Sequence, residues 1–408
     1  MTTRVVVSGI GLVTPVGSSL EEFRRAIYSG KPGIREIQDF DTSRCETKVG
    51  GTVTEFNPHS VLTNKEIFRL DKGTQMAVVA GAAALRDSRL LDNGAIEDAS
   101  ELGTVIGTGT GSAHSVEQSY CAFFTQRRID PFSIPMGMHH AAASYLSIKF
   151  GLRGCGLTVS TACSSGAVAL GAAFHEIKSG RSCRMLAGGV DASLTRTHLE
   201  IWGSMRVLSS QNEHPERCMK PFSRNRDGFV IGEGAVMLVL EELESARGRG
   251  APIYGEVVGY GCSSDASHIT APSVDGPIMA MTRALRSAEI GAESVDYINA
   301  HGTATYLNDK TETEAIKRTF PQRSVPVSSI KPITGHMFGA SSAAEFVAIL
   351  LACQLGEIPP TVNYEQEDPE CDLDYVVAGP RKTSVRYALS NSFAFGGHNA
   401  VLVAKRVE

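Results

Sequence analysis

The sequence carries the same three-part pattern twice: a short β-type run, a turn of small residues and a long helix pattern rich in Ala and Gly. The first copy spans residues 157–178 and the second spans residues 326–355. Small side chains let a helix backbone approach its neighbours closely, as happens where helices are sandwiched between two sheets. The repeat therefore indicates two similar halves whose Ala/Gly-rich helices lie between packed sheets.

Strand-like runs alternate with helical periodicity along most of the chain, which is typical of an α/β layered fold. We expect helices over 75–88, 163–178, 275–288, 309–318 and 339–355. The expected strands are Val5–Ser8, Thr104–Ile106, Leu157–Ser160, Met185–Leu186, Val236–Leu240, Val257–Val258, Tyr297–Asn299, Val325–Ser328, Ala388–Asn391 and Val401–Ala404.

Length and composition fit one large α/β domain or two intimately packed halves, because 408 residues with 42% hydrophobic content can bury a large core. Nine cysteines without CxxC or zinc-type spacing indicate a reducing cytoplasm and no metal site. The apolar run Val5–Val13 is broken by glycine, and no 18-residue apolar stretch exists, so we expect neither a signal peptide nor membrane insertion. A formal net charge of −5 argues against a nucleic-acid partner.

Cys163 lies at a junction that suits a nucleophile. It belongs to the segment STACSSG, residues 160–166, between a β-type run and a long helix pattern. The free N–H groups and the positive end of a helix N-terminus stabilise a thiolate, so we expect its pKa to lie below the usual value of about 8.5. A buried structural cysteine fits the same local sequence, since cysteine is among the most buried residue types.

Two further segments supply groups that assist a thiolate. The sequence NAHGT at 299–303 contains His301, and KPITGH at 331–336 contains Lys331 and His336. Each segment follows a short β-type run. A base or a cationic group beside a thiol is typical of nucleophilic catalysis, so these segments favour a catalytic Cys163.

Six motifs in one order resemble a known family. They are TACSSG, KPFS at 220–223, RDGFV at 226–230, NAHGT, KPITGH and NSFAFGG at 391–397. Together the chain resembles the β-ketoacyl-acyl-carrier-protein synthases of the thiolase fold, from Val5 to Val403. One such motif is weak evidence, whereas their shared order and spacing are specific.

The resemblance implies a thiolase-like five-layer αβαβα fold with two similar halves. Residues 1–250 would carry the nucleophile, and residues 251–408 would carry the histidines, the lysine and a gating loop. It also implies a ping-pong reaction, in which an acyl group passes from the phosphopantetheine of an acyl carrier protein to Cys163. Malonyl-carrier protein then loses carbon dioxide, and its enolate attacks the acyl thioester to extend the chain by two carbons. No metal and no cofactor beyond the carrier's phosphopantetheine is implied.

The resemblance assigns a role to each motif residue. His301 and His336 would donate hydrogen bonds to the malonyl thioester oxygen as it becomes an enolate. The backbone N–H groups of Cys163 and Phe395 would form an oxyanion hole, with Gly396 and Gly397 completing the gating loop. Lys331 would organise the site electrostatically, together with a supporting network of three carboxylates: Asp309, Glu312 and Glu345.

The resemblance also places a pocket and a partner surface. The acyl pocket and its gate would include Thr110, Phe132, Met138, Asp265 and His268. Five basic residues would dock the acidic carrier protein: Lys65, Arg69, Arg127, Arg128 and Arg206. The family is dimeric, so we expect a homodimer or a heterodimer with a paralogue of the chain-length-factor type.

Three functional alternatives stay open at this point. The leading one is an elongating synthase of a fatty-acid, polyketide or polyene pathway. The second is the catalytic ketosynthase subunit of a type II polyketide synthase, paired with a chain-length factor. The third is a non-catalytic subunit that shapes a partner's pocket, which is disfavoured because Cys163, both histidines and Lys331 are present. A nucleotide-binding loop at 107–111 is also disfavoured, because the spacing is GxGxG without the acidic residue that such a site needs.

Overall fold

The computed structural model describes residues 3–92, 94–96 and 98–407. Within these residues, a 10-stranded mixed sheet runs in the order β12-β11-β15-β16-β10-β1-β9-β8-β6-β7. Its strands are β1 (Val5–Val13), β6 (Leu102–Gly107), β7 (Gly156–Val159), β8 (Arg184–Asp191), β9 (Gly234–Glu242), β10 (Gly255–Ser264), β11 (Tyr297–Asn299), β12 (Val327–Ser328), β15 (Tyr387–Ala394) and β16 (His398–Lys405). Each expected strand overlaps one of them.

The sheet consists of two halves with the same topology. They meet where Val5–Val7 of β1 pairs with β10. From this junction outward, one half runs β1-β9-β8-β6-β7 and the other runs β10-β16-β15-β11-β12. In both halves the two inner pairings are antiparallel and the two outer pairings are parallel. The duplication indicated by the sequence repeat is therefore confirmed.

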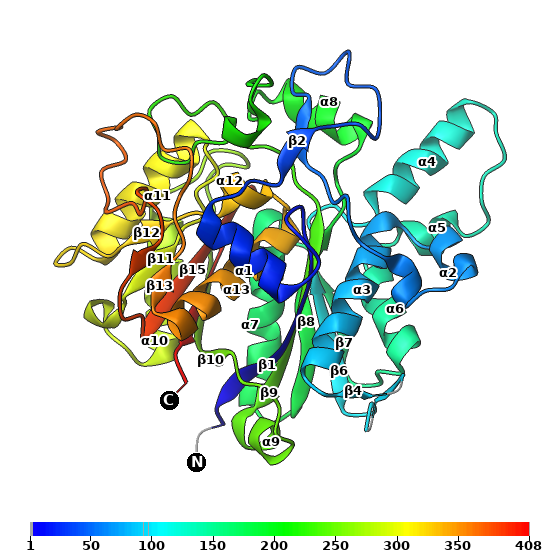
Figure 1. Cartoon of the computed structure of the whole chain (residues 1–408), viewed down its shortest axis with the longest axis horizontal. Helices are drawn as coiled ribbons and strands as arrows, with labels where there is room; N and C mark the ends of the chain where they lie inside the picture. Colours follow the sequence, from blue (N-terminus) through cyan, green and yellow to red (C-terminus); the bar gives the residue numbers. More distant parts are fainter. Residues whose placement is uncertain (1–2, 93, 97, 408) are drawn as a thin grey trace.

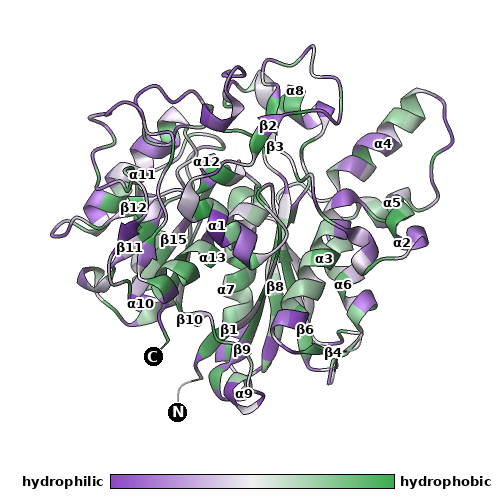
Figure 2. Ribbon diagram, viewed as in Figure 1, coloured by the Kyte–Doolittle hydropathy of each residue, from purple (hydrophilic) through white to green (hydrophobic). Residues whose placement is uncertain are grey.

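The helices complete five layers. α7 (Ser165–Lys178) and α13 (Gly339–Leu355) contact each other and strands of both half-sheets. α3 (Lys72–Asp87) packs on the first half-sheet, and α10 (Asp275–Ala288) packs on the second, with α11 (Tyr306–Thr319) beside it. The order is helix, sheet, paired helices, sheet, helix, with the apolar residues gathered in the middle layers (Figures 1 and 2). The expected αβαβα fold is confirmed, as are all five expected helices.

Shorter elements surround this frame. The remaining α-helices are α1 (Leu20–Ser29), α2 (Asn64–Phe68), α4 (Ala113–Phe124), α5 (Ser133–Gly137), α6 (Ala141–Phe150), α8 (Arg196–Ser204), α9 (Leu243–Gly248) and α12 (Lys331–Thr334). Short two-stranded pairings are β2 (Ile34–Glu36) with β3 (Val49–Gly51), β4 (Leu91–Asp92) with β5 (Ala95–Ile96), and β13 (Glu357–Ile358) with β14 (Arg381–Lys382). α4 and α5 project from one side of the molecule (Figure 1). No helix of the described residues is long and apolar enough to cross a membrane.

The two ends of the sheet differ. β12 is covered on its outer side, where Val327 exchanges backbone hydrogen bonds with the segment 374–376. β7 lies at the other end, and its residues Gly156 and Leu157 are exposed. Among the described residues, only the β7 end of this sheet is therefore an open strand edge.

Glycines allow α7 and α13 to approach the sheet and each other. A Cβ atom at Gly189 of β8 would lie 2.0 Å from the carbonyl oxygen of Gly339 at the start of α13. A Cβ atom at Gly166 of α7 would lie 2.4 Å from the same oxygen. Residues 339–353 of α13 are all buried, so the backbone there has no room to retreat. The packing of the central layer thus requires glycine at both positions.

We expect Gly189→Ala to destabilise the fold by about 1–3 kcal/mol, because the added methyl group overpacks a rigid backbone contact. Gly248→Ala in α9 is the matched control, since no atom lies within 4 Å of its added Cβ. Thermal unfolding followed by circular dichroism compares the two variants. Equal melting temperatures would contradict the close contact between β8 and α13.

Candidate active site

Cys163 lies in a short 3-10 turn, Ala162–Ser164, that leads directly into α7. The turn is held by Ser165, whose hydroxyl accepts a hydrogen bond from the Thr161 N–H at 2.9 Å and donates one to the Ala162 carbonyl at 2.6 Å. The Cys163 side chain is buried. The backbone N–H groups of Cys163 and Phe395 both interact with the sulfur and favour its thiolate form.

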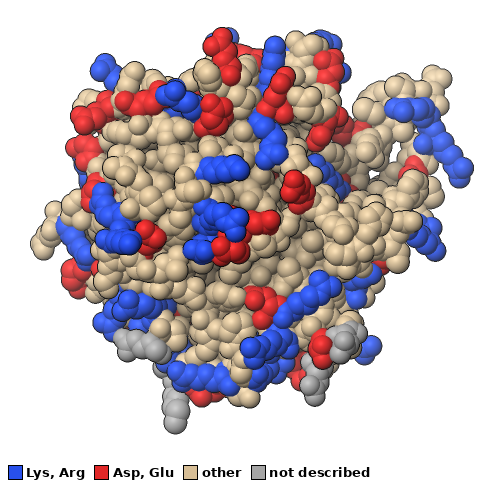
Figure 3. Space-filling model, viewed as in Figure 1, with Lys and Arg blue, Asp and Glu red and all other residues tan. Residues whose placement is uncertain are grey.

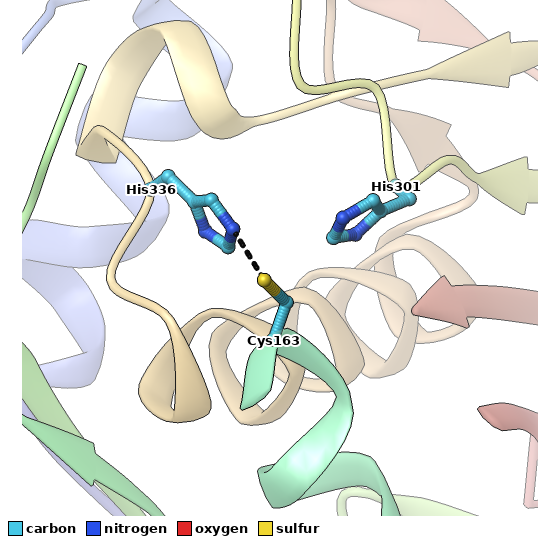
Figure 4. A group of neighbouring side chains, drawn as sticks. All are labelled: Cys163, His301 and His336. Atoms are coloured by element: carbon cyan, nitrogen blue, oxygen red, sulfur yellow. Dashed lines mark hydrogen bonds between the residues drawn. The ribbon is translucent and has the colours of Figure 1, made fainter. Parts of the chain in front are cut away.

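His336 and His301 lie beside this sulfur (Figure 4). His336 Nε2 is 3.0 Å from Cys163 Sγ. The two imidazole rings lie 5.6 Å apart between centroids at an interplanar angle of 82°. One ligand-type atom from each of the three residues lies within 4.8 Å of the others, and all three side chains are buried. The structure therefore brings together the cysteine of one half and the histidines of the other.

His336 follows α12 and is fixed from two directions. Its backbone N–H donates to the Val230 carbonyl at 2.7 Å, and its carbonyl accepts from the Gly232 N–H at 2.9 Å. Its Nδ1 atom lies 3.1 Å from the Ser341 hydroxyl. These contacts orient the ring so that Nε2 points at the sulfur, where it can take or return a proton.

His301 follows β11 and is held through its backbone by Glu312 of α11. The Glu312 carboxylate accepts hydrogen bonds from the N–H groups of His301 and Gly302, both at 2.8 Å. The Nδ1 atom of His301 lies 3.3 Å from Lys331 Nζ. An ammonium group can only donate, so Nδ1 accepts and the ring proton resides on Nε2. His301 thereby presents an N–H donor.

Lys331 is fully buried and links His301 to Glu345. Its ammonium group contacts the Glu345 carboxylate, the His301 carbonyl and the His301 ring. Glu345 lies on α13, so this ion pair ties α12 to the central layer. Of the three carboxylates expected to support the site, Glu312 and Glu345 thus contact His301 or Lys331. Asp309 instead accepts from the Phe222 N–H at 2.7 Å and pairs with Arg226.

Burial sets the protonation states of the site. It raises the pKa of Cys163 to about 12. The charge of Lys331 and the two backbone N–H groups lower this pKa, but their effect is smaller than that of burial. The expected lowering of the thiol pKa by the helix N-terminus is therefore wrong, because burial disfavours the charged thiolate more than these contacts favour it. Burial and the neighbouring Lys331 hold the pKa values of His301 and His336 well below the usual value. The resting site contains a neutral thiol and neutral imidazoles.

A cavity of about 430 Å³ opens onto Cys163 and both histidines. Its wall is rich in aromatic rings: Trp202, Phe229, Phe338, Phe393 and Phe395. Its lining also includes Asp265, which is half-buried, and the exposed residues Arg206 and His268. This volume and the mixture of apolar wall and few polar groups are typical of a site for an organic ligand.

Three residues expected in the acyl pocket lie elsewhere among the described residues. Thr110 turns toward Asp191, which accepts hydrogen bonds from its backbone N–H at 2.9 Å and from its hydroxyl at 2.8 Å. The guanidinium group of Arg69 lies over the Phe132 ring, with its Cζ atom 4.3 Å from the ring centroid. Met138 is exposed at the end of α5. None of the three lines the cavity around Cys163, so their role in an acyl pocket stays a prediction.

The two expected gating residues lie beside the turn Phe395–Gly397 that joins β15 to β16. The backbone N–H of Asp265 donates to the Gly397 carbonyl at 2.9 Å, and its carboxylate accepts from the Asn399 side chain at 2.7 Å. His268 is exposed, and its Nδ1 atom accepts the N–H groups of Thr270 and Ala271. The Asp265 loop is thus hydrogen-bonded to the turn, and a gating role for Asp265 and His268 stays a prediction.

The expected docking residues are all exposed. Lys65 belongs to α2 and Arg69 follows it, whereas Arg127 and Arg128 follow α4. In the space-filling view, Lys and Arg side chains lie on the projecting segment around α4 (Figure 3). Arg206 stands apart from these four at the mouth of the cavity.

Two residues near the site, Asp191 and Trp202, belong to none of the sequence motifs. Asp191 is fully buried at the end of β8 and accepts N–H groups from Gly109 and from Gly339, both at 2.7 Å. It thereby joins the β6 loop to the N-terminus of α13. An acidic residue at the end of an apolar strand was the available signal. Trp202 is the single tryptophan of the chain and lies in the cavity wall.

One thiol and two imidazoles are also a donor set that zinc accepts. Here the same atoms are the candidate nucleophile and its partners.

Comparison with known proteins gives one family throughout. Residues 2–246 match the family model described as "Beta-ketoacyl synthase, N-terminal domain", and residues 254–365 match its C-terminal domain. A 3-oxoacyl-[acyl-carrier-protein] synthase 2 of Synechocystis sp. is 42% identical, with 99% of this chain and 98% of that protein covered. The protein of the same name from Coxiella burnetii is 40% identical, with 99% of each covered.

Solved structures give the same result. The ishigamide ketosynthase/chain length factor superposes with a TM-score of 0.93 at 33% identity, and 100% of each chain is covered. A type II polyketide synthase ketosynthase, solved in complex with its acyl-carrier protein, superposes with a TM-score of 0.90 at 32% identity, again with 100% of each chain covered.

We expect Lys331→Met to destabilise the protein by about 3–5 kcal/mol, because it leaves Glu345 without its buried partner. Adding Glu345→Gln should recover part of this loss, since the unpaired charge is then removed as well. Lys310→Met is the control, because Lys310 forms an exposed ion pair with Glu370, which water screens and which contributes little to stability. Melting temperatures rank the variants; a Lys331→Met protein as stable as Lys310→Met would refute the buried pair.

We expect alkylation of Cys163 by iodoacetamide to accelerate about tenfold per pH unit between pH 7 and pH 9. The pKa of about 12 lies above this range, so the reactive thiolate fraction grows steadily with pH. Intact-protein mass spectrometry measures the rate, and Cys163→Ala gives the background from the other cysteines. A rate that levels off below pH 8 would show that the thiol pKa is not raised.

Proposed function

The chain belongs to the β-ketoacyl synthase family, and from that premise we propose that it is a 3-oxoacyl-[acyl-carrier-protein] synthase with Cys163 as its nucleophile. The observation that carries this assignment is the 3.0 Å contact between Cys163 Sγ and His336 Nε2 at the base of the cavity. His301 faces the same point with an N–H donor. A nucleophile, a base and hydrogen-bond donors therefore converge where a thioester carbonyl can be bound.

The first step is acyl transfer to the enzyme. Cys163 Sγ attacks the thioester carbonyl of an acyl-carrier protein while its proton passes to His336 Nε2. The oxygen of the tetrahedral intermediate takes hydrogen bonds from the backbone N–H groups of Cys163 and Phe395. The carbon–sulfur bond to the carrier breaks, and the pantetheine sulfur leaves with the proton from His336. Concerted proton transfer suits a resting thiol whose pKa is too high for a free thiolate.

The second step is decarboxylative condensation. The malonyl thioester oxygen binds between the two imidazoles and accepts a hydrogen bond from each as it becomes an enolate. His301 donates from Nε2, and His336 donates from Nε2 in the neutral tautomer whose Nδ1 accepts the Ser341 hydroxyl; the base of the first step is the other tautomer. Carbon dioxide leaves, and the carbon that bore it attacks the acyl thioester on Cys163. The new carbon–carbon bond forms as the bond from the acyl carbon to Sγ breaks. The Cys163 thiolate released in this step takes a proton from solvent, which replaces the proton that left on the pantetheine sulfur of the first carrier. The β-ketoacyl chain departs on the second carrier.

Lys331 supports both steps without touching the substrate. Its charge keeps the His301 proton on Nε2 through the contact with Nδ1. Glu345 balances that charge, and Glu312 fixes the backbone of His301. We assign Asp309 to the same supporting network. It acts indirectly, because it pairs with Arg226, which lines the cavity.

The substrates arrive on an acyl carrier protein, and the family needs no other cofactor. We assign the docking of this acidic partner to Lys65, Arg69, Arg127, Arg128 and Arg206. Arg206 lies at the cavity mouth, where the pantetheine arm enters. A ketosynthase of similar structure has been solved with its carrier protein, which supports this route.

The protein works as a dimer. Two observations support an interface beside β7: the open strand edge, and exposed apolar side chains on α4 and α5, including Phe123, Phe124 and Ile134. The partner is a second copy or a paralogue of the chain-length-factor type. The similar structure of the ishigamide ketosynthase/chain length factor supports the paralogue as partner. Our second candidate function is therefore the catalytic subunit of a heterodimeric polyketide synthase.

Three broader assignments complete the proposal. Residues 1–250 form the half that carries the nucleophile, and residues 251–408 form the half that carries the histidines, Lys331 and the Phe395 turn. The acyl pocket continues from the cavity toward Thr110, Phe132 and Met138, with Asp265 and His268 at its gate. The reaction takes place in the cytoplasm, consistent with nine unpaired cysteines.

We expect the wild-type protein to take an acyl group on Cys163 from a panel of acyl-carrier proteins, and to lose it when malonyl-carrier protein is added. Intact-protein mass spectrometry follows the adduct and the product that is longer by two carbons. Cys163→Ala should abolish both events. Cys163→Gln should still decarboxylate malonyl-carrier protein, because its amide occupies the place of an acyl thioester and leaves both histidines intact.

Elongation by the Cys163→Ala variant would refute the nucleophile assignment. If wild-type protein remains unacylated where a control synthase reacts, the second candidate gains support. The same measurement is then made after coexpression with a chain-length-factor paralogue.

A further inference from the structure

Three aromatic rings form a stack in the wall of the Cys163 cavity. Trp202 of α8 lies between Phe338 and Phe395, with ring centroids 5.3 Å and 5.7 Å away and interplanar angles of 29° and 16°. Phe229 meets the same indole edge-on at 5.6 Å and 76°. Such aromatic pairs stabilise a structure beyond the area they bury. Trp202 therefore links two segments of the cavity wall that are far apart in sequence.

The two partners of Trp202 differ in how firmly they are held. Phe338 directly precedes α13, whose first N–H group is bonded to the buried Asp191 carboxylate at 2.7 Å. The Phe338 ring also packs on the His336 imidazole at 5.0 Å. Phe338 is consequently part of the rigid central layer.

Phe395 begins a turn whose next two residues are glycines with φ values of 82° and 72°. The turn backbone is hydrogen-bonded to the Asp265 loop, through Gly396 N–H to the Ile269 carbonyl at 2.8 Å and Asp265 N–H to the Gly397 carbonyl at 2.9 Å. Its aromatic side chain is held from the opposite side by Trp202. Turn and loop can therefore move together once the ring contact breaks.

We propose that Trp202 is a positioning residue that latches the Phe395 turn over Cys163. When Cys163 carries an acyl chain, the Trp202–Phe395 stack opens while the Trp202–Phe338 stack persists. This inference rests on the proposed function, because the acyl chain supplies the group that displaces the Phe395 ring. Closed, the turn holds the Phe395 N–H at the sulfur, so the latch assembles the oxyanion hole before the substrate arrives.

The chain contains a single tryptophan, so its fluorescence reports the surroundings of Trp202, including this stack. The protein is mixed with an acyl-carrier protein that lacks tryptophan, and emission and intact mass are followed in parallel. We expect the emission of Trp202 to change at the rate at which the Cys163 adduct forms. Cys163→Ala, given the same acyl-carrier protein, should show no change. An adduct that forms fully without a change in emission would overturn the latch.

A second comparison needs no acyl group. Phe395→Ala should show, before any substrate is added, an emission that differs from that of the unacylated wild-type protein, because its stack is already broken. Emission equal to that of the unacylated wild type would overturn the proposal. Failure of acylation would count against the proposed function, whereas this comparison still tests the stack itself.

Substitution of Trp202 separates latching from ordinary packing. Trp202→Leu should slow acylation of Cys163 about threefold to tenfold, the range given by the loss of one aromatic pair. Trp202→Phe keeps a flat ring and should restore the rate to within about twofold. Melting temperatures confirm that both variants are folded. A Trp202→Phe protein as slow as Trp202→Leu would show that size, and not stacking, is what matters.

Discussion

The contact between α7 and α13 in the central layer is the constraint on which the site depends. Each half of the sheet sends one buried helix into this layer, and the two helices begin close together. Gly166 and Gly189 make this possible, because both approach the Gly339 carbonyl more closely than any Cβ would permit. Cys163 precedes one helix and His336 precedes the other. A duplicated fold therefore brings together two different sets of groups at its centre.

Burial at this centre has two opposing effects. It allows Lys331, Glu345 and the histidines to act on one another without screening by water. It also disfavours the thiolate that the chemistry needs, so that the sulfur rests as a thiol beside His336. The base His336 and the backbone N–H donors of Cys163 and Phe395 are already in position beside the sulfur. The negative charge can therefore form as the sulfur attacks a carbonyl, and these donors stabilise it on the carbonyl oxygen.

Much of the fold could be predicted because buried strands and helices have apolar residue patterns that are visible in the local sequence. The strand at 236–240 is apolar throughout, the helix at 339–355 is mostly apolar, and both were predicted. The α4 helix was missed because its large apolar residues, Phe123 and Phe124, face outward and give no inward stripe. Motif order located Cys163, His301, Lys331 and His336. The thiol pKa was mispredicted, since a helix start is visible in sequence whereas the depth of burial is not.

The two ends of the sheet determine how large an assembly this chain can build. Since β12 is already covered by residues 374–376, only the β7 end can accept another strand. Two copies, or one copy and a paralogue, that join through this edge use up the free edge of both. Growth through the central sheet then stops, because no free edge of that sheet remains among the described residues. The asymmetry of an otherwise duplicated sheet thus protects a protein with ten central strands from forming open-ended fibres.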